Sequence, residues 1–198
     1  MTRRSCVIFL LDEYVGVGPE DPRSLHGWLQ RELFTPLAIR SEQVTPLAGD
    51  AADLEQACRA YEAAVHAAGG LDLAILGLGP NGHIGYNDPP AASAAPTRVL
   101  RLSQSSLDIC ARDWGAGVPL LPQAMTAGMD LLLAARQKLL IVSGESKQQI
   151  LYKSLLEQVT PDVPASYLQQ ADGVLVLVDK AATRGALAAA LAGGAFAN

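Results

Sequence analysis

The side chains best suited to acid–base chemistry gather on one short segment of the chain. Asn81, His83, Asn87 and Asp88 all lie between residues 77 and 96, a stretch rich in Gly and Pro. This composition predicts an irregular loop. A His with a carboxylate five residues away on such a loop can transfer protons near neutral pH. The alternative is a histidine that only stabilises the loop.

Two other segments place charged groups next to apolar runs. Asp12 follows the apolar run of residues 6–11, where an acid either caps a turn or serves an active site. Lys147 lies in the segment SGESK, at a predicted strand-to-helix turn. Backbone N–H groups at such a turn favour an anion, and the lysine adds positive charge. The remaining histidines, His26 and His66, fall in helical patterns and are expected at surface or boundary positions.

The glycines of the loop fit a dinucleotide-binding pattern that their context excludes. Gly77, Gly79 and Gly82 have the spacing G-x-G-x-x-G. That fingerprint needs a helix opening at the glycines and an acid about 20 residues further on. Here a Gly- and Pro-rich stretch follows, and residues 98–106 contain no acid. A glycine-rich turn is the simpler interpretation.

Apolar runs alternate along the chain with helical patterns, and these elements must position the loop. We expect strands at residues 6–11, 71–76, 99–102, 138–142 and 173–178. We expect helices within residues 21–34 (Asp21 as N-cap, Pro22 at the first position), 51–68 (Asp50 as cap, Gly69 and Gly70 as stop), 104–112, 124–135, 145–158 and 180–191.

Continuous apolar strands separated by helices predict an α/β fold. Such strands are typical of a mostly parallel, Rossmann-like sheet, buried on both faces by flanking helices. We expect residues 1–198 to form a single domain. Ligands bind such sheets beyond the carboxyl ends of the strands, where DEYVG, GLGPNGHIGYNDPP and SGESK follow their strands.

Composition narrows the classes of function. Hydrophobic residues make up 49% and charged residues 18%, which is typical of a globular protein. The net charge is −5 and no long basic run occurs, so a nucleic-acid partner is not expected. The three cysteines, Cys6, Cys58 and Cys110, are widely spaced and odd in number, which indicates neither a disulfide framework nor a zinc ribbon. No apolar stretch reaches the ~20 residues of a membrane span, and we expect a cytoplasmic protein without a membrane partner.

Four ordered segments make the chain similar to a known enzyme family. LDEYVG with DPRSLHGWLQRELF, GLGPNGHIGYNDP, AMTAGMDLLLAARQKLLIVSGESK and VPASYLQQADGVLVLVDKAA resemble the glucosamine-6-phosphate deaminase/isomerase family, and they cover nearly the whole chain. The resemblance implies a sugar-phosphate isomerase type of fold and a small-molecule sugar phosphate as ligand. It implies no metal and no organic cofactor. It leaves a homo-oligomer open.

The resemblance also assigns roles residue by residue. Asp12 would be the base that removes the C2 proton in enolisation, and His83 would assist ring opening. Asp88 would orient His83 or join it, and Asn81 stands two residues before the histidine, where the family has Asp or Asn. These four residues are the expected catalytic set.

The phosphate-binding set is also taken from the resemblance. Lys147 would contact the substrate phosphate, and Arg112 is our placement for a second phosphate-binding cation. We also assign Gly79 and Gly82 to substrate or phosphate binding.

Three departures from the family pattern stand out. The family begins one strand–helix–strand unit earlier, with a loop of the form GxPTGxTP, and we expect this chain to lack that unit. Asp88 stands where the family usually has Glu. The loop of residues 89–96 lacks the basic residues tied to allosteric activation, so we expect no such regulation.

The expected reaction converts an amino-sugar 6-phosphate to the ketose 6-phosphate and ammonia. Glucosamine 6-phosphate and galactosamine 6-phosphate both remain open as substrates. A 6-phosphogluconolactonase is the alternative enzyme, although that branch continues its histidine loop with Ser-Leu-Phe-Pro where this chain has residues 86–89, YNDP. A truncated protein that only binds a sugar phosphate is the third reading.

Overall fold

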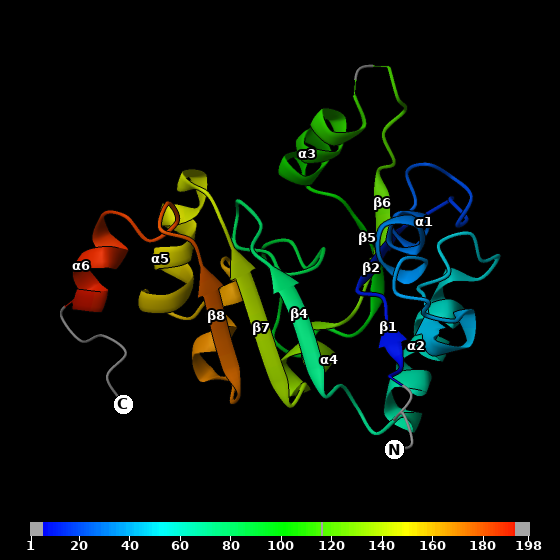
Figure 1. The fold of residues 1–198 in the computed structure, drawn as a ribbon, viewed down its shortest axis with the longest axis horizontal. Helices are drawn as coiled ribbons and strands as arrows, with labels where there is room; N and C mark the ends of the chain where they lie inside the picture. The colour runs from blue at the N-terminus through cyan, green and yellow to red at the C-terminus, as the bar shows by residue number, and fades with distance from the viewer. Residues whose placement is uncertain (1–5, 116, 193–198) are drawn as a thin grey trace. The chain divides into compact units, whose positions relative to one another are not determined.

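The computed structural model describes residues 6–115 and 117–192. These residues form two compact units (Figure 1). The first unit combines Met1–Gly70 with Pro96–Gly128, and the second combines Leu71–Ala95 with Met129–Asn198. The expectation of one domain over residues 1–198 stays a prediction, and each unit is described by itself.

The second unit is built on a parallel sheet. Its strands, in the order β4-β7-β8, are Leu73–Gly77, Gln137–Val142 and Val174–Val178. Its helical segments are α4 (Met129–Ala134), η3 (Glu145–Lys147), α5 (Gln148–Leu156), η4 (Pro164–Gln170) and α6 (Ala186–Ala192). This arrangement, visible in Figure 1, confirms the α/β class and the parallel strands.

Only one face of this sheet is buried. Leu76, Leu140 and Val142 lie in the core, at most 3% exposed. On the other face, Ile75 is 61% and Leu175 65% exposed. The expectation that both faces are buried is therefore wrong for this sheet as the structure describes it. A continuous apolar run shows that both faces of a strand are apolar, but it does not show that the same chain covers both.

The first unit contains an antiparallel sheet that the sequence did not indicate. Its order is β2-β6-β5, from strands Asp12–Tyr14, Gln123–Thr126 and Arg98–Arg101. A separate parallel pair joins β1 (Ile8–Phe9) to β3 (Val44–Thr45). The remaining elements are α1 (Leu25–Leu29), η1 (Gln30–Phe34), η2 (Ser41–Gln43), α2 (Leu54–Ala67) and α3 (Gln104–Trp114).

Two predicted elements need correction. The helix expected at residues 124–135 is strand β6 followed by α4, because the first residues pair with both β2 and β5. Sheet pairing overrides the helix propensity of Ala and Met there. The strand expected at residues 6–11 is shorter, Ile8–Phe9, and a second strand begins at Asp12.

The N-caps of two helices also differ from the prediction. Ser24, not Asp21, caps α1 through a bond from the Gly27 N–H, and Asp53, not Asp50, caps α2. In each case the cap is the residue immediately before the first helical turn, since the side chain of the cap must reach the N–H groups of that turn. The stop of α2 is confirmed, because Gly69 has φ +87°.

Among the described residues, no helix is long and apolar enough to cross a bilayer.

Candidate functional site

The two acids that close the first apolar run have different environments. The Glu13 side chain is 2% exposed. Its Oε1 accepts the N–H groups of Tyr14 and Leu25, and its Oε2 accepts the Ser24 hydroxyl at 2.7 Å and the His26 N–H at 3.0 Å. Glu13 is thus a cap for the start of α1, and this contact fixes the backbone that follows Asp12.

Asp12 is the first residue of β2 and pairs in register with Thr126. It is half-buried. Burial, together with the negative charge of Asp12, raises the pKa of Tyr61 far above its ordinary value. The carboxylate of Asp12 therefore acts electrostatically on the interior of the first unit, and strand pairing holds its backbone.

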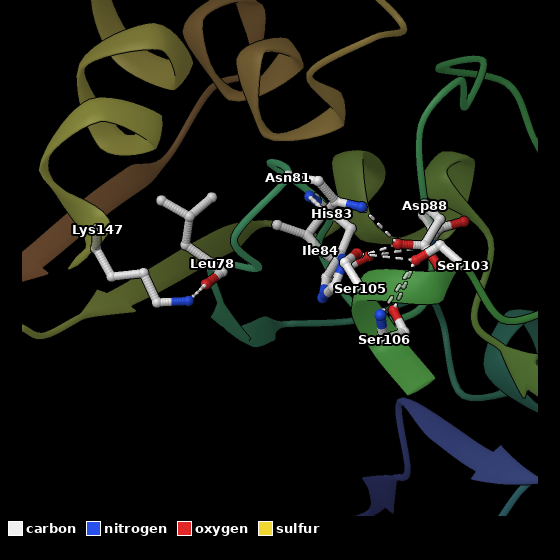
Figure 2. Close-up of polar contacts among 10 residues, drawn as sticks. Leu78, Asn81, His83, Ile84, Asp88, Ser103, Ser105, Ser106 and Lys147 are labelled. Carbon is white, nitrogen blue, oxygen red and sulfur yellow. Dashed lines mark hydrogen bonds and ion pairs between the residues drawn. The ribbon is translucent and has the colours of Figure 1, made fainter. Parts of the chain in front are cut away.

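Arg112 belongs to the same unit and lies in the last turn of α3. Its side chain is 75% exposed, and its Nε donates to Asp113 at 3.1 Å. The other end of this helix is capped by Ser103, which also bonds Ser105 and Ser106 (Figure 2). The helix thus presents Arg112 as an exposed cation.

Three of the expected catalytic residues meet in the second unit, on the loop that follows β4 (Figure 2). Nδ1 of His83 lies 2.8 Å from Oδ1 of Asp88, and Nδ2 of Asn81 donates to the same oxygen at 2.9 Å. Oδ1 of Asn81 accepts the backbone N–H of His83 at 3.2 Å. The side chains of His83 and Asp88 are 12% and 10% exposed. The loop therefore holds its own acid–base pair in a partly buried position.

This geometry determines how the imidazole can act. An ionised carboxylate only accepts hydrogen bonds, so Asp88 selects the tautomer of neutral His83 with its proton on Nδ1. The lone pair then lies on Nε2, which can take up and return a proton. Asn81 donates to Asp88 through its amide nitrogen, and its position suits an orienting role.

The loop glycines satisfy different steric needs. Gly82 has φ +86°, which favours glycine, and a Cβ there would lie 2.7 Å from the Val163 side chain. The N–H of Gly79 donates to the carbonyl of His83 at 2.9 Å. A Cβ on Gly79 would overlap the imidazole ring of His83.

Lys147 ends η3 and precedes α5, beyond the carboxyl end of β7. Its Nζ donates to the carbonyl of Leu78 at 2.6 Å, as Figure 2 shows. The turn before it is fixed by Asp179, which accepts the Gly144 N–H at 3.0 Å. The ammonium group of Lys147 thus lies beside the β4 loop, in contact with the residue that precedes Gly79.

The structure brings together Asn81, His83 and Asp88 by direct contact, and Lys147 reaches the same loop. Asp12 and Arg112 lie in the first unit, and the roles expected for all six residues stay predictions. The role of Glu13 as a cap was not predicted, because the partners that it binds at the start of α1 lie eleven to thirteen residues away, beyond any local capping pattern. Within residues 6–115 and 117–192, no cluster of three or more His, Cys, Asp and Glu side chains suits a metal ion.

The chain is similar to proteins of a known family. The family described as glucosamine-6-phosphate isomerases/6-phosphogluconolactonase matches residues 2–177. A glucosamine-6-phosphate deaminase of Rhodopirellula baltica is 40% identical over 174 residues, which cover 88% of this chain and 69% of the relative. Glucosamine-6-phosphate deaminase 2 of Bacillus subtilis is 38% identical over 173 residues, 86% of this chain and 70% of the relative.

Solved structures of related proteins have the same fold as this chain. A monomeric glucosamine-6-phosphate deaminase superimposes with a TM-score of 0.84 at 34% identity, over 89% of this chain and 73% of that one. The 6-phosphogluconolactonase of Thermotoga maritima matches with a TM-score of 0.67 at 21% identity, over 87% and 72% of the two chains, which shows the fold alone. The family resemblance is confirmed: this chain belongs to the family of glucosamine-6-phosphate isomerases and 6-phosphogluconolactonases.

Proposed function

We propose that this chain is an amino-sugar-6-phosphate deaminase that converts glucosamine 6-phosphate, or its C4 epimer, to the ketose 6-phosphate and ammonia. The observation that carries the proposal is the Asn81–His83–Asp88 cluster at the carboxyl end of β4. It lies in a chain that is 31–40% identical to relatives named glucosamine-6-phosphate deaminase.

The chemistry divides into ring opening and isomerisation. Nε2 of His83 takes the proton of the anomeric hydroxyl and delivers a proton to the ring oxygen, which opens the sugar. The Asp12 carboxylate removes the proton at C2, and C1 gains a proton as the enediol-like intermediate collapses. The C2 imine that results is hydrolysed: water supplies the C2 oxygen and ammonia leaves.

Charged groups suit the phosphate end of such a substrate. Lys147 offers an ammonium beside the β4 loop, and Arg112 offers an exposed guanidinium. Charge-assisted hydrogen bonds to phosphate are about twice as strong as neutral ones. Binding energy from the phosphate can hold the sugar for reaction at C1 and C2.

A 6-phosphogluconolactonase is the weaker alternative. The lactonase structures match at 18–21% identity, where similarity extends to the fold alone, whereas a deaminase structure matches at 34%. The loop sequence also favours the deaminase, since residues 86–89 read YNDP rather than the Ser-Leu-Phe-Pro of the lactonase branch.

The test is a substrate panel with the purified chain. Ammonium release is measured with glucosamine 6-phosphate and galactosamine 6-phosphate in parallel, and lactone hydrolysis with 6-phosphogluconolactone. We expect ammonium from one or both amino sugars and no accelerated lactone hydrolysis. Lactone hydrolysis without ammonium release would show that the chain is a 6-phosphogluconolactonase. A folded protein that acts on none of the three substrates would contradict both enzymes and favour a protein that only binds a sugar phosphate.

A further inference from the structure

We infer that Gly79 is a positioning residue for His83: its bare Cα provides the space in which the imidazole lies while it bonds Asp88. This inference concerns the same site and rests on the proposed function for its kinetic consequence. Its structural part stands on contacts within the second unit.

The steric observation is specific to the edge of the ring that would react. A Cβ built on Gly79 overlaps Nε2, Cδ2 and Cε1 of His83. Nε2 and Cδ2 lie across the ring from Nδ1, the nitrogen that faces Asp88, and Cε1 joins the two nitrogens. Any side chain at position 79 therefore displaces the nitrogen that carries the lone pair.

The backbone that carries the ring is held in place by three hydrogen bonds. The Gly79 N–H donates to the His83 carbonyl at 2.9 Å, and the Gly82 N–H donates to the Gly79 carbonyl at 3.1 Å. The His83 N–H is held by Asn81 at 3.2 Å. The backbone at both positions is thus fixed within one short loop, and the ring can move only by rotation of its own side chain, so a methyl group at position 79 acts directly on the bond between His83 and Asp88.

The requirement for glycine here is steric and does not come from the backbone angles. Gly79 has no φ in the left-handed region, unlike Gly82 at +86°. Alanine can adopt the backbone of residue 79, so Gly79→Ala probes the overlap with the ring alone. Gly77 offers a matched control two residues earlier, since it also has no left-handed φ and a Cβ there meets nothing within 4 Å.

The first experiment follows the imidazole directly. The chain has three histidines, so the ring Nδ1–H of His83 can be assigned by ¹⁵N-edited NMR with a His83→Gln reference. We expect to observe this hydrogen-bonded proton in the wild type and in Gly77→Ala, and to lose it in Gly79→Ala.

The second experiment measures steady-state kinetics with the amino sugar that the substrate panel selects. The kcat of Gly79→Ala should fall about 100-fold, as expected for a 1 Å displacement, with KM changed less. Gly77→Ala should stay within about twofold.

A double-mutant cycle of thermal unfolding midpoints tests the contact between Gly79 and His83 without an activity assay. Overpacking at position 79 should lower the unfolding midpoint by about 5 °C in the wild-type background. In a His83→Ala background the overlap is gone, so the same substitution should shift the midpoint by less than about 1 °C. If Gly79→Ala does not fold, Gly79→Ala/His83→Ala should restore folding.

The results separate the two claims. An intact His83 Nδ1–H signal in Gly79→Ala, or equal thermal shifts in both backgrounds, would overturn the positioning role. Absence of ammonium release by the wild type would overturn the proposed function, while the NMR and thermal results still decide the role of Gly79.

Discussion

The imidazole of His83 and the carboxylate of Asp88 meet at 2.8 Å, Nδ1 to Oδ1, within the loop that follows β4 in the second unit. The same Asp88 oxygen receives the amide of Asn81 at 2.9 Å. One carboxylate oxygen therefore fixes both the tautomer of the histidine and the path of the loop around it.

Replacing Asp88 should impair catalysis through His83. Asp88→Asn keeps the volume but can present an amide N–H to Nδ1, which favours the wrong tautomer. We expect kcat to fall by about 100-fold or more at pH 7, by analogy with the loss seen when the orienting Asp of a catalytic triad becomes Asn. Asp88→Glu, which restores the family's usual acid, should retain more activity. Equal activity of Asp88→Asn and the wild type in steady-state assays would contradict this role.

The histidine cluster could be predicted from the sequence because it is local. Asn81, His83 and Asp88 lie within eight residues of one another, and an irregular loop after a strand keeps them close. The steric role of Gly79 could not be predicted, since it depends on which rotamer the His83 ring adopts.

Long-range contacts explain the other differences. The cap that Glu13 forms on α1 needs a turn of the chain that brings residues 24–26 back to β2. The strand at Gln123–Thr126 forms because β2 and β5 lie on either side of it, a pairing that periodicity along the chain cannot reveal. The exposed face of β4-β7-β8 has the same apolar pattern as a buried one.

Glu13 should contribute to stability more than to chemistry. Glu13→Gln replaces one acceptor oxygen with an amide nitrogen, so at least two of its bonds to buried donors are lost. We expect a loss of about 2–4 kcal/mol in the free energy of unfolding, measured by urea denaturation. Glu42→Gln is the control. The Glu42 side chain is exposed, so this substitution should lower the free energy of unfolding by less than about 0.5 kcal/mol. Similar losses in both variants would argue against the cap.

Lys147 should matter for the phosphate group of the substrate. With Lys147→Ala we expect KM for the amino-sugar phosphate to rise about 10- to 100-fold, the equivalent of one charge-assisted hydrogen bond. Lys180→Ala, an exposed lysine after β8, should leave KM unchanged. An unchanged KM in Lys147→Ala would exclude this lysine as a phosphate contact.

Stability at high pH should depend on Tyr61. Burial and the charge of Asp12 raise the pKa of its hydroxyl above 10, so the folded state favours the protonated phenol. The resulting stability is complete below pH 10 and is lost as pH rises above it, at up to about 1.4 kcal/mol per pH unit. Burial likewise raises the pKa of the Cys58 thiol to about 11, so the folded state loses further stability as the pH rises from 9 to 11.

Tyr61→Phe removes the first of these contributions and keeps the aromatic ring that contacts Phe9. Thermal midpoints measured from pH 7 to 12 should therefore fall less steeply above pH 10 in this variant than in the wild type. The same slope in both proteins would show that the Tyr61 hydroxyl does not ionise with unfolding.

The most direct test of the proposed reaction measures both products with the wild type and Asp12→Asn. The wild type should release ammonium and ketose 6-phosphate in equal amounts from glucosamine 6-phosphate or galactosamine 6-phosphate. Asp12→Asn should bind a non-reacting sugar-phosphate analogue nearly as well and release neither product. Turnover by Asp12→Asn at the wild-type rate would contradict the role of Asp12, and a folded wild type that releases neither product would contradict the deaminase itself.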